Sequence, residues 1–192
     1  MKTNFEHLKN YPKSYEYGTT VEKQILNAEN SAELENAGNT MRKLIEGLVK
    51  LMIEKYHFEA DNPEGNKHVS FGSHIRILRL KQAINQKSID NLYRIKVLGN
   101  ISSHPSTTIS ETEIREMYRL VYEESYRFVN FYLTDKALSD YKKGQKENVG
   151  RRKHQNQAVS NNNTTSSENN FDGWLAVGVV CAVIVFGLLI FL

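Results

Sequence analysis

The sequence predicts an all-α protein: an antiparallel helical bundle followed by one C-terminal transmembrane helix. Apolar residues recur at intervals of three and four along two long segments, residues 31–56 and 109–133, as on one face of a helix. No segment shows the apolar–polar alternation of a strand. Residues 174–192 (WLAVGVVCAVIVFGLLIFL) form an uncharged apolar run that is long enough, as a helix, to span the hydrocarbon core of a bilayer.

The first half of the bundle is expected to hold a short helix at residues 20–28 and a long one at 31–56. No proline interrupts the long segment, and its apolar positions fall on one stripe. They are Leu34, Ala37, Met41, Leu44, Ile45, Leu48, Met52 and Ile53. Residues 57–72 (HFEADNPEGNKHVSFG) are polar and contain proline and glycine, which predicts a loop.

The second half is expected to hold helices at residues 74–85, 88–98 and 109–133, with Gly99 ending the middle one. The last helix starts at a capping box, Ser110 followed by Glu113. Its apolar stripe is Ile114, Met117, Tyr118, Val121, Phe128, Val129 and Tyr132. Such a stripe indicates core packing, and the aromatic side chains beside it leave base stacking on RNA as the alternative.

The composition divides the chain into three parts: a helical domain (1–143), a disordered polar tether (144–173) and the membrane helix (174–192). The tether is rich in Asn, Ser and Thr and has few large apolar side chains, so ordering it gains little burial. A basic cluster at 151–153 precedes the apolar run, and no cation follows it. By the positive-inside rule, we expect a single-pass tail anchor in the cell membrane with a cytoplasmic N-terminal domain.

Several kinds of chemistry are not indicated. The net charge of the chain is only +3, which does not predict the broad basic face of a non-specific nucleic-acid binder. Phosphate-cradling glycine loops, nucleophile elbows and C-x-x-C pairs are missing, and Cys181 is the single cysteine. The acidic and histidine side chains in and beside the 57–72 loop fit no standard zinc spacing, so no metal and no cofactor is predicted. They are His57, Glu59, Asp61, His68 and His74.

Two segments carry a resemblance to a known family. Ala37 and residues 41–50 (MRKLIEGLVK) match an A…xRKxLExxVK helix, with Ile45 in place of the leucine. Residues 95–105 (IKVLGNISSHP) match an I-[RK]-x-x-G-N-x-x-x-H-P stretch. From about Phe5 to Leu133 the chain resembles the HEPN-like helical domain catalogued as domain-of-unknown-function family 4145. That domain is common in type I restriction subunits and related bacterial defence or helicase proteins.

The resemblance implies a set of site residues. Some HEPN proteins are metal-independent ribonucleases that act as dimers and use an R-x(4–6)-H motif, in which the histidine moves a proton and the arginine holds phosphate charge. His104 and Asn100 match the histidine and its polar neighbour. No arginine stands at the required spacing; Lys96 lies one residue too far away, and Arg42 or Arg94 would have to replace it in three dimensions.

Three functions remain open. The leading hypothesis is a membrane-tethered, non-enzymatic binding or sensor module of bacterial (phage) defence, in which Arg42, Glu46, Asn100 and His104 form a polar network that fixes the helices or a binding groove. The alternative is a homodimeric HEPN-type endoribonuclease with His104 as acid–base and Lys96 as charge partner. The third makes the membrane helix the effector, controlled by the domain. The expected partners are the lipid bilayer, through residues 174–192, and a protein that the sequence does not identify, with a second copy or RNA under the alternative.

Overall fold

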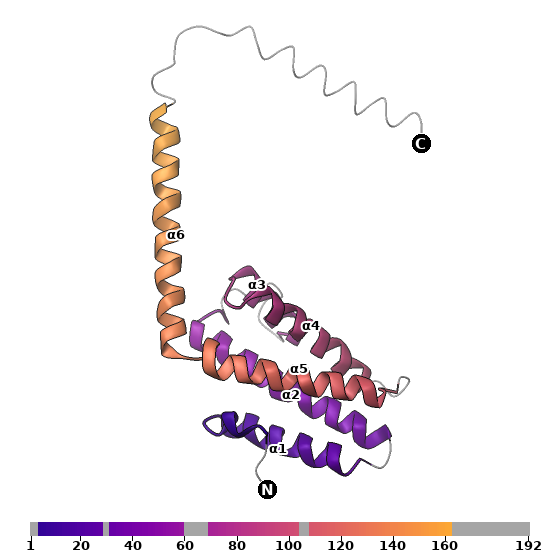
Figure 1. The fold of residues 1–192 in the computed structure, drawn as a ribbon. Coiled ribbons are helices and arrows are strands. Elements are labelled where there is room, and N and C mark those ends of the chain that lie inside the picture. The colour runs from indigo at the N-terminus through magenta and orange to yellow at the C-terminus, as the bar shows by residue number, and fades with distance from the viewer. Residues whose placement is uncertain (1–3, 29–30, 60–68, 104–107, 163–192) are drawn as a thin grey trace, which may run out of the picture. The chain divides into compact units, whose positions relative to one another are not determined.

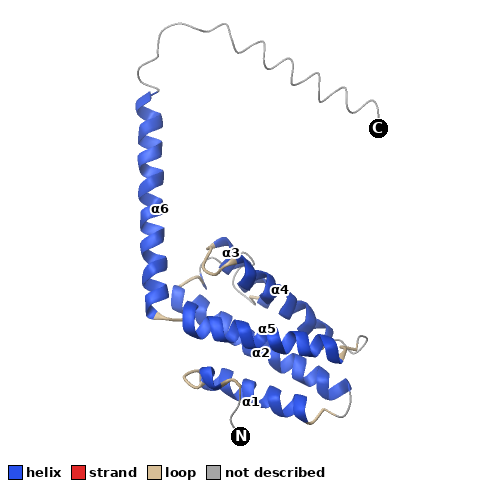
Figure 2. Cartoon of the chain, viewed as in Figure 1, coloured by secondary structure: helices blue, strands red, loops and turns tan. Residues whose placement is uncertain are grey.

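The computed structural model describes residues 4–28, 31–59, 69–103 and 108–162 of the chain, and all regular elements in these ranges are helices (Figure 2). They are η1 (Glu6–Leu8), α1 (Pro12–Leu26), α2 (Ser31–Tyr56), α3 (Phe71–Leu80), α4 (Gln86–Ile101), α5 (Glu111–Arg127), the π-helical η3 (Phe128–Tyr132) and α6 (Asp135–Asn162). The all-α prediction is confirmed. No described helix combines the length and the apolar character that a membrane span requires, and the apolar run 174–192 lies outside the described residues.

Helix α2 is the centre of the bundle and contacts α1, α3, α4 and α5 (Figure 1). It spans the residues that the sequence predicts, and its apolar stripe is buried apart from the half-buried Leu34. Burying a stripe of this kind is the main stabilising term for a helix of ordinary propensity. The core therefore forms around the longest amphipathic segment of the bundle.

The packing of α4 on α5 is antiparallel. Near the start of α4 the hydroxyls of Ser88 and Tyr132 lie 3.0 Å apart, and further along Arg94 donates two hydrogen bonds to Glu116, at 3.0 and 2.7 Å. The hydrogen bonds from Arg94 hold the pKa of the Glu116 carboxyl below its usual value. Arg94, one of the two candidates to replace the missing motif arginine, is thus paired with a carboxylate.

The packing of α2 on α5 is parallel, which corrects the prediction of a wholly antiparallel bundle. Ile114, near the start of α5, lies beside Gly38 in the first half of α2. At the other end, the Tyr56 hydroxyl donates to the Tyr132 carbonyl at 2.7 Å. Because α4 runs against both α2 and α5, the two long helices point the same way (Figure 1).

Two helices begin earlier than predicted, because each has an N-terminal signal that lies before its first apolar stripe residue. α1 starts at Pro12 rather than at residue 20, since proline suits the first helical turn, where no N–H partner is needed. α3 starts at Phe71 rather than at residue 74, because the Ser70 hydroxyl accepts from the Ser73 N–H. Helix formation at Phe71 and Gly72 shortens the predicted 57–72 loop, of which residues 60–68 lie outside the described ranges.

Two helix ends also differ from the prediction. α3 ends at Leu80 rather than at residue 85, because Asn85 caps α4 and accepts from the Ser88 N–H at 2.8 Å. α4 continues through Gly99 to Ile101, so Gly99 is not its stop. The glycine is required for a close contact rather than for a turn.

Two glycines, one on α2 and one on α4, permit the close contact between these helices. A Cβ at Gly99 would lie 2.8 Å from the Arg42 Cδ, so the stem of Arg42 occupies the space above the glycine. A Cβ at Gly38 would lie 2.7 Å from the Ser102 Cβ, and Ser102 is buried. Each helix thus supplies one glycine to receive a side chain of the other.

Polar contacts stabilise both ends of the helix formed by α5 and η3. The predicted capping box is present, and the hydrogen bonds from Ser110 to Glu113 lower the pKa of that carboxyl. Beyond Arg127 the chain widens into the π-helical turn η3 and the helix then ends, which leaves its last carbonyl groups without partners inside the helix. The Tyr132 carbonyl accepts from the Tyr56 hydroxyl, and the Leu133 carbonyl accepts from the Lys55 ammonium at 2.6 Å.

Helix α6 covers the first part of the segment that the sequence assigns to a tether, residues 144–173. Its first turns belong to the compact unit Met1–Gly144, where Leu138 and Tyr141 pack on the core. The helix then continues to Asn162. Gln, Lys, Glu and Arg have favourable helix propensities, and extending an existing helix avoids the free-energy cost of nucleating a new one. The remainder of the predicted tether lies outside the described residues.

The glycine contact between α2 and α4 predicts an effect on stability. Gly38→Ala should destabilise the domain by about 1–3 kcal/mol, because the added Cβ meets the Ser102 side chain and overpacking outweighs the better helix propensity of alanine. Urea unfolding of a chain truncated after residue 173, followed by circular dichroism, measures the change. Gly144→Ala is the matched control, since a Cβ there meets nothing within 4 Å, and an equal effect of both changes would contradict the prediction.

Candidate functional site

A chain of polar contacts crosses from α2 to the end of α4 and brings together three of the four predicted network residues. The Arg42 Nη1 donates to the Asn100 Oδ1 at 3.1 Å, and the Arg42 Nε lies 4.0 Å from a Glu46 oxygen. One turn further along α2, the Lys50 ammonium lies 3.1 Å from Glu46. None of these charged side chains is fully buried: Arg42 is 30% exposed, Glu46 22% and Lys50 50%. Each ion pair therefore contributes modestly to stability, and its main effect is to fix the positions of the side chains.

The same end of α4 is fastened to α2 by neutral hydrogen bonds. The Asn39 amide donates to the Ser102 carbonyl at 3.1 Å, and the Ser103 hydroxyl donates to the Asn39 side-chain oxygen at 2.5 Å. The segment that leads to His104 is therefore held by α2 up to residue 103. His104 itself lies outside the described residues, so its place in the predicted network remains a prediction.

Lys96, the predicted charge partner of His104, packs in another direction. Its ammonium lies 2.8 Å from the position that a Cβ of Gly72 would take, so the side chain crosses the first turn of α3. It makes no hydrogen bond and no ion pair within the described part of the chain. Arg42 contacts α4 from α2, whereas Lys96 extends from α4 towards α3, and no described contact joins them.

A hollow of about 540 Å³ opens between α1 and α2, and Glu46 and Lys50 form part of its wall. Its full lining is Lys13, Ser14, Tyr17, Lys43, Glu46, Gly47, Lys50, Leu51 and Glu54. A Cβ at Gly47 would meet only the Ser14 hydroxyl, at 4.0 Å, whereas Gly18, Gly38, Gly72 and Gly99 are each covered by a side chain within 3 Å. A glycine inside a helix costs about 0.5–1 kcal/mol relative to alanine, and no packing inside the domain accounts for this one.

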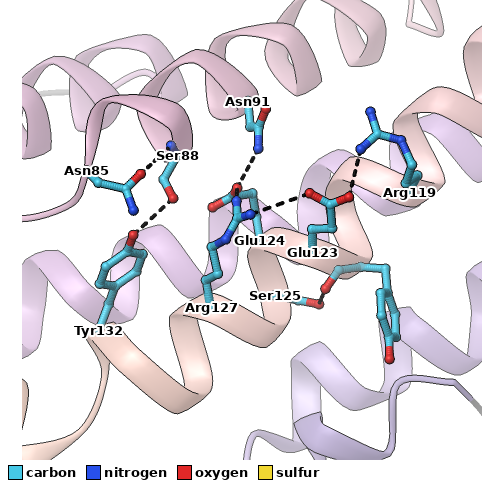
Figure 3. A network of polar contacts seen from close by, with 10 residues as sticks. Asn85, Ser88, Asn91, Arg119, Glu123, Glu124, Ser125, Arg127 and Tyr132 are labelled. Carbon is cyan, nitrogen blue, oxygen red and sulfur yellow. Dashed lines mark hydrogen bonds and ion pairs between the residues drawn. The ribbon is translucent and has the colours of Figure 1, made fainter.

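A second polar network surrounds Glu124, which is fully buried between α4 and α5 (Figure 3). Its Oε1 accepts from the Asn91 amide at 2.6 Å and pairs with Arg127, while its Oε2 has no hydrogen-bond partner among the described residues. Arg127 also approaches Glu123, which pairs with Arg119 on the surface. Sequence reasoning missed Glu124, because one acidic residue beside an apolar stripe gives no signal that it points inwards.

His7 and Ser125 form the nearest approach to a catalytic dyad among the described residues. The His7 Nε2 lies 2.8 Å from the Ser125 hydroxyl, and burial lowers the pKa of His7. However, Ser125 is fully buried, and its hydroxyl is placed to donate to the Tyr122 carbonyl at 3.0 Å. A substrate has no access to this oxygen, so the pair fastens the N-terminal segment to α5.

No three His, Cys, Asp or Glu residues gather as metal ligands within ranges 4–28, 31–59, 69–103 and 108–162. Of the acidic and histidine residues in and beside the 57–72 loop, Asp61 and His68 lie outside those ranges.

Taken together, the fold and these contacts define a small all-α domain whose polar side chains form helix–helix contacts and border an open hollow. The chain belongs to the family DUF4145, described as a domain of unknown function, whose model matches residues 23–143. This confirms the family that the 41–50 and 95–105 segments indicated. Neither a curated protein nor a solved structure shows a significant match to the chain.

Because Glu124 is buried, we expect the loss of its cationic partner to lower the stability of the domain strongly. Arg127→Met should destabilise the domain by about 3 kcal/mol, because Glu124 would keep a buried negative charge without its cationic partner. Arg115→Met is the control, since Arg115 and Glu111 are both largely exposed, and it should change stability by less than about 0.5 kcal/mol. Urea unfolding of the chain truncated after residue 173 compares them. A restored stability in Arg127→Met/Glu124→Gln would assign the cost to the charge, and equal effects of the two methionine variants would contradict the prediction.

Proposed function

We propose that the chain is a membrane-tethered, non-enzymatic binding or sensor module with a HEPN-like fold, acting as a component of bacterial defence. The observation that supports a binding role over catalysis is the engagement of Arg42, which donates to Asn100, covers Gly99 and borders Glu46. An arginine that stabilises transferred phosphate charge presents free N–H donors to the substrate. Arg94 is likewise paired with Glu116.

The membrane tether rests on residues 174–192, an uncharged run of a length that suits one transmembrane helix. The basic residues Arg151, Arg152 and Lys153 precede this run and favour a cytoplasmic location for the helical domain. In this arrangement the domain binds its partner at the inner face of the cell membrane.

A metal-independent, homodimeric HEPN-type endoribonuclease is the second candidate. The observation that favours it is the 3.1 Å contact that brings the Arg42 guanidinium to Asn100, four residues before His104. An arginine of α2 would then replace the one that is missing from the linear motif, with His104 moving the proton and Lys96 supplying additional charge.

An RNA cleavage assay separates the two functions. We expect the full-length protein in non-ionic detergent to leave mixed RNA intact in the presence of EDTA, because Arg42 is already engaged by Asn100 and Glu46. Gel electrophoresis of the RNA is the measurement. Cleavage that disappears in His104→Ala and Arg42→Gln, but persists in the control His57→Ala, would contradict the binding module and support the ribonuclease.

Fractionation of cells tests the tether. The full-length chain should sediment with membranes and resist alkaline carbonate, whereas a chain truncated after residue 173 should be released, because only the removed segment is apolar enough to insert. Protease added outside intact cells should leave residues 1–143 undigested. Membrane association that survives the truncation, or digestion of the domain from outside, would overturn the tether or its orientation.

A further inference from the structure

We propose that the hollow between α1 and α2 is a docking site for an amphipathic helical segment of a partner protein. The segment inserts one apolar side chain over Gly47 and presents carboxylates to the lysines around it. The inference rests on the proposed binding role and specifies where the partner binds and what its contacting segment contains. Three features of the described domain support it: the covering of its glycines, the course of the lining along α2, and the charges of the lining.

Glycines inside helices α1 to α4 receive side chains from other elements. Four of them have a side-chain atom within 3 Å of the position that a Cβ would take: Gly18 from Phe5, Gly38 from Ser102, Gly72 from Lys96 and Gly99 from Arg42. Gly47 is the exception in the described part of these helices, since a Cβ there would meet only the Ser14 hydroxyl, at 4.0 Å. Glycine is less favourable than alanine inside a helix, and it permits close approach of another group. The space over Gly47 therefore suits a side chain that another molecule supplies.

The lining of the hollow follows one face of α2 for about three turns. The lining residues that α2 contributes are Lys43, Glu46, Gly47, Lys50, Leu51 and Glu54. Intervals of three and four mark one face of a helix, and α2 rises roughly 16 Å between residues 43 and 54. Lys13, Ser14 and Tyr17 of α1 line the opposite side. An elongated surface between two helices fits a third helix, whose apolar anchors recur at the same intervals.

Apolar surface is exposed at the middle of this lining. Leu51 is 38% exposed although it belongs to the central helix of the bundle, and Tyr17 is only partly buried. With the open space over Gly47, they border a hollow of about 540 Å³, which holds more than one side chain. Burial of these groups against an apolar anchor of the partner supplies the hydrophobic contribution to docking.

The lysines of the lining favour carboxylates beside that anchor. Lys13 and Lys43 make no hydrogen bond and no ion pair with the described residues. Lys13 also lies in the first turn of α1, which contains no acidic residue and has no side-chain cap. A carboxylate of the partner at this position is stabilised both by the ammonium groups and by the positive end of the helix dipole.

The carboxylates of the same lining favour a protein segment over a nucleic acid. Glu46 lies 3.1 Å from the Lys50 ammonium, and Glu54 is a second acidic residue of the wall. A phosphate backbone carries a negative charge at every nucleotide, so part of it would lie against these groups. A peptide helix can place carboxylates beside the lysines alone and leave uncharged residues beside Glu46 and Glu54.

Fluorescence anisotropy of a labelled peptide, with the full-length protein in non-ionic detergent, tests the site. The probe is a synthetic amidated peptide of alanine and glutamate with one central leucine, about 15 residues long so that it can form a helix. We expect this leucine peptide to bind at an ionic strength of about 0.15 M. Replacing its leucine by glycine should weaken binding about tenfold, because the apolar anchor is lost. Replacing its glutamates by glutamine should weaken binding to a similar extent.

A pair of double variants tests the charges. Lys13→Gln/Lys43→Gln should weaken binding of the leucine peptide about tenfold, as loss of two partly exposed ion pairs does. Lys87→Gln/Lys142→Gln is the matched control, because it removes the same charge from exposed lysines outside the lining. The control should change the affinity less than about twofold. Equal affinities of the two double variants would overturn the site.

Gly47→Ala gives a signature that a purely structural role of the hollow would not produce. The variant should raise Tm by about 2–4 °C, because alanine favours helix and meets no clash. It should also weaken binding of the leucine peptide about fivefold, because the added methyl group occupies the space of the leucine. The affinity of the glycine peptide should stay unchanged, since two positions couple in this way only when they are in contact.

The remaining outcomes would overturn the docking site. They are absence of binding of the leucine peptide, an equal loss of affinity for both peptides in Gly47→Ala, and displacement of the leucine peptide by single-stranded RNA of the same length. A wild-type dimer in sedimentation velocity that Gly47→Ala dissociates would assign the hollow to a second copy of the chain instead. RNA cleavage is a separate readout: it would overturn the non-enzymatic module and leave the docking site in place.

Discussion

The contact of Arg42 with Gly99 and Asn100 is the constraint on which the arrangement of the bundle depends. The absence of a side chain at Gly99 lets the Arg42 stem lie against α4, and the guanidinium then reaches the Asn100 amide oxygen. Ser102 fits above Gly38 one turn away in the same crossing. Both contacts set how closely α4 approaches the central helix, and α4 in turn positions α5.

The contacts of Glu124 with Asn91 and Arg127 lie directly before the change from α-helix to the π-helical turn η3. Glu124 is buried and needs the Asn91 amide and Arg127, so it fixes the register of α5 against α4. The π-helical turn follows directly, and the carbonyls at its end accept hydrogen bonds from Lys55 and Tyr56 at the end of α2. A buried charge pair adds little net stability, but a shift of α5 that separated the two charges would be strongly destabilising. The pair therefore selects one register of α5 against α4.

Local patterns predicted the features that local interactions decide. The 31–56 helix, its buried stripe and the Ser110–Glu113 capping box follow from apolar spacing and from hydrogen bonds within one turn. The errors concern features that distant residues decide. From the sequence, Gly99 is predicted to end its helix, whereas in the structure it makes room for the Arg42 side chain. Apolar periodicity carries no information on the relative direction of two helices, so it does not predict that α2 and α5 are parallel. For the site, Arg42, Glu46 and Asn100 were predicted as one network and do lie together, whereas the hollow forms only when α1 packs on α2.

Among the described residues, polar groups are paired where α2 crosses α4, and several lack partners where α2 crosses α1. This difference indicates which part of the domain is suited to binding. Where α2 meets α4, glycines are covered and Arg42 is paired. Where it meets α1, Gly47 is uncovered, the Ser14 hydroxyl lines the hollow without a hydrogen bond to the described residues, and Lys13 occupies the unfavourable end of a helix dipole. Stability alone would favour an alanine, a paired hydroxyl and an acidic first turn at these places. Departures from local preference that cluster on one surface are expected where a protein gives up stability for binding, so the α1–α2 hollow is the part of the described domain best suited to a ligand.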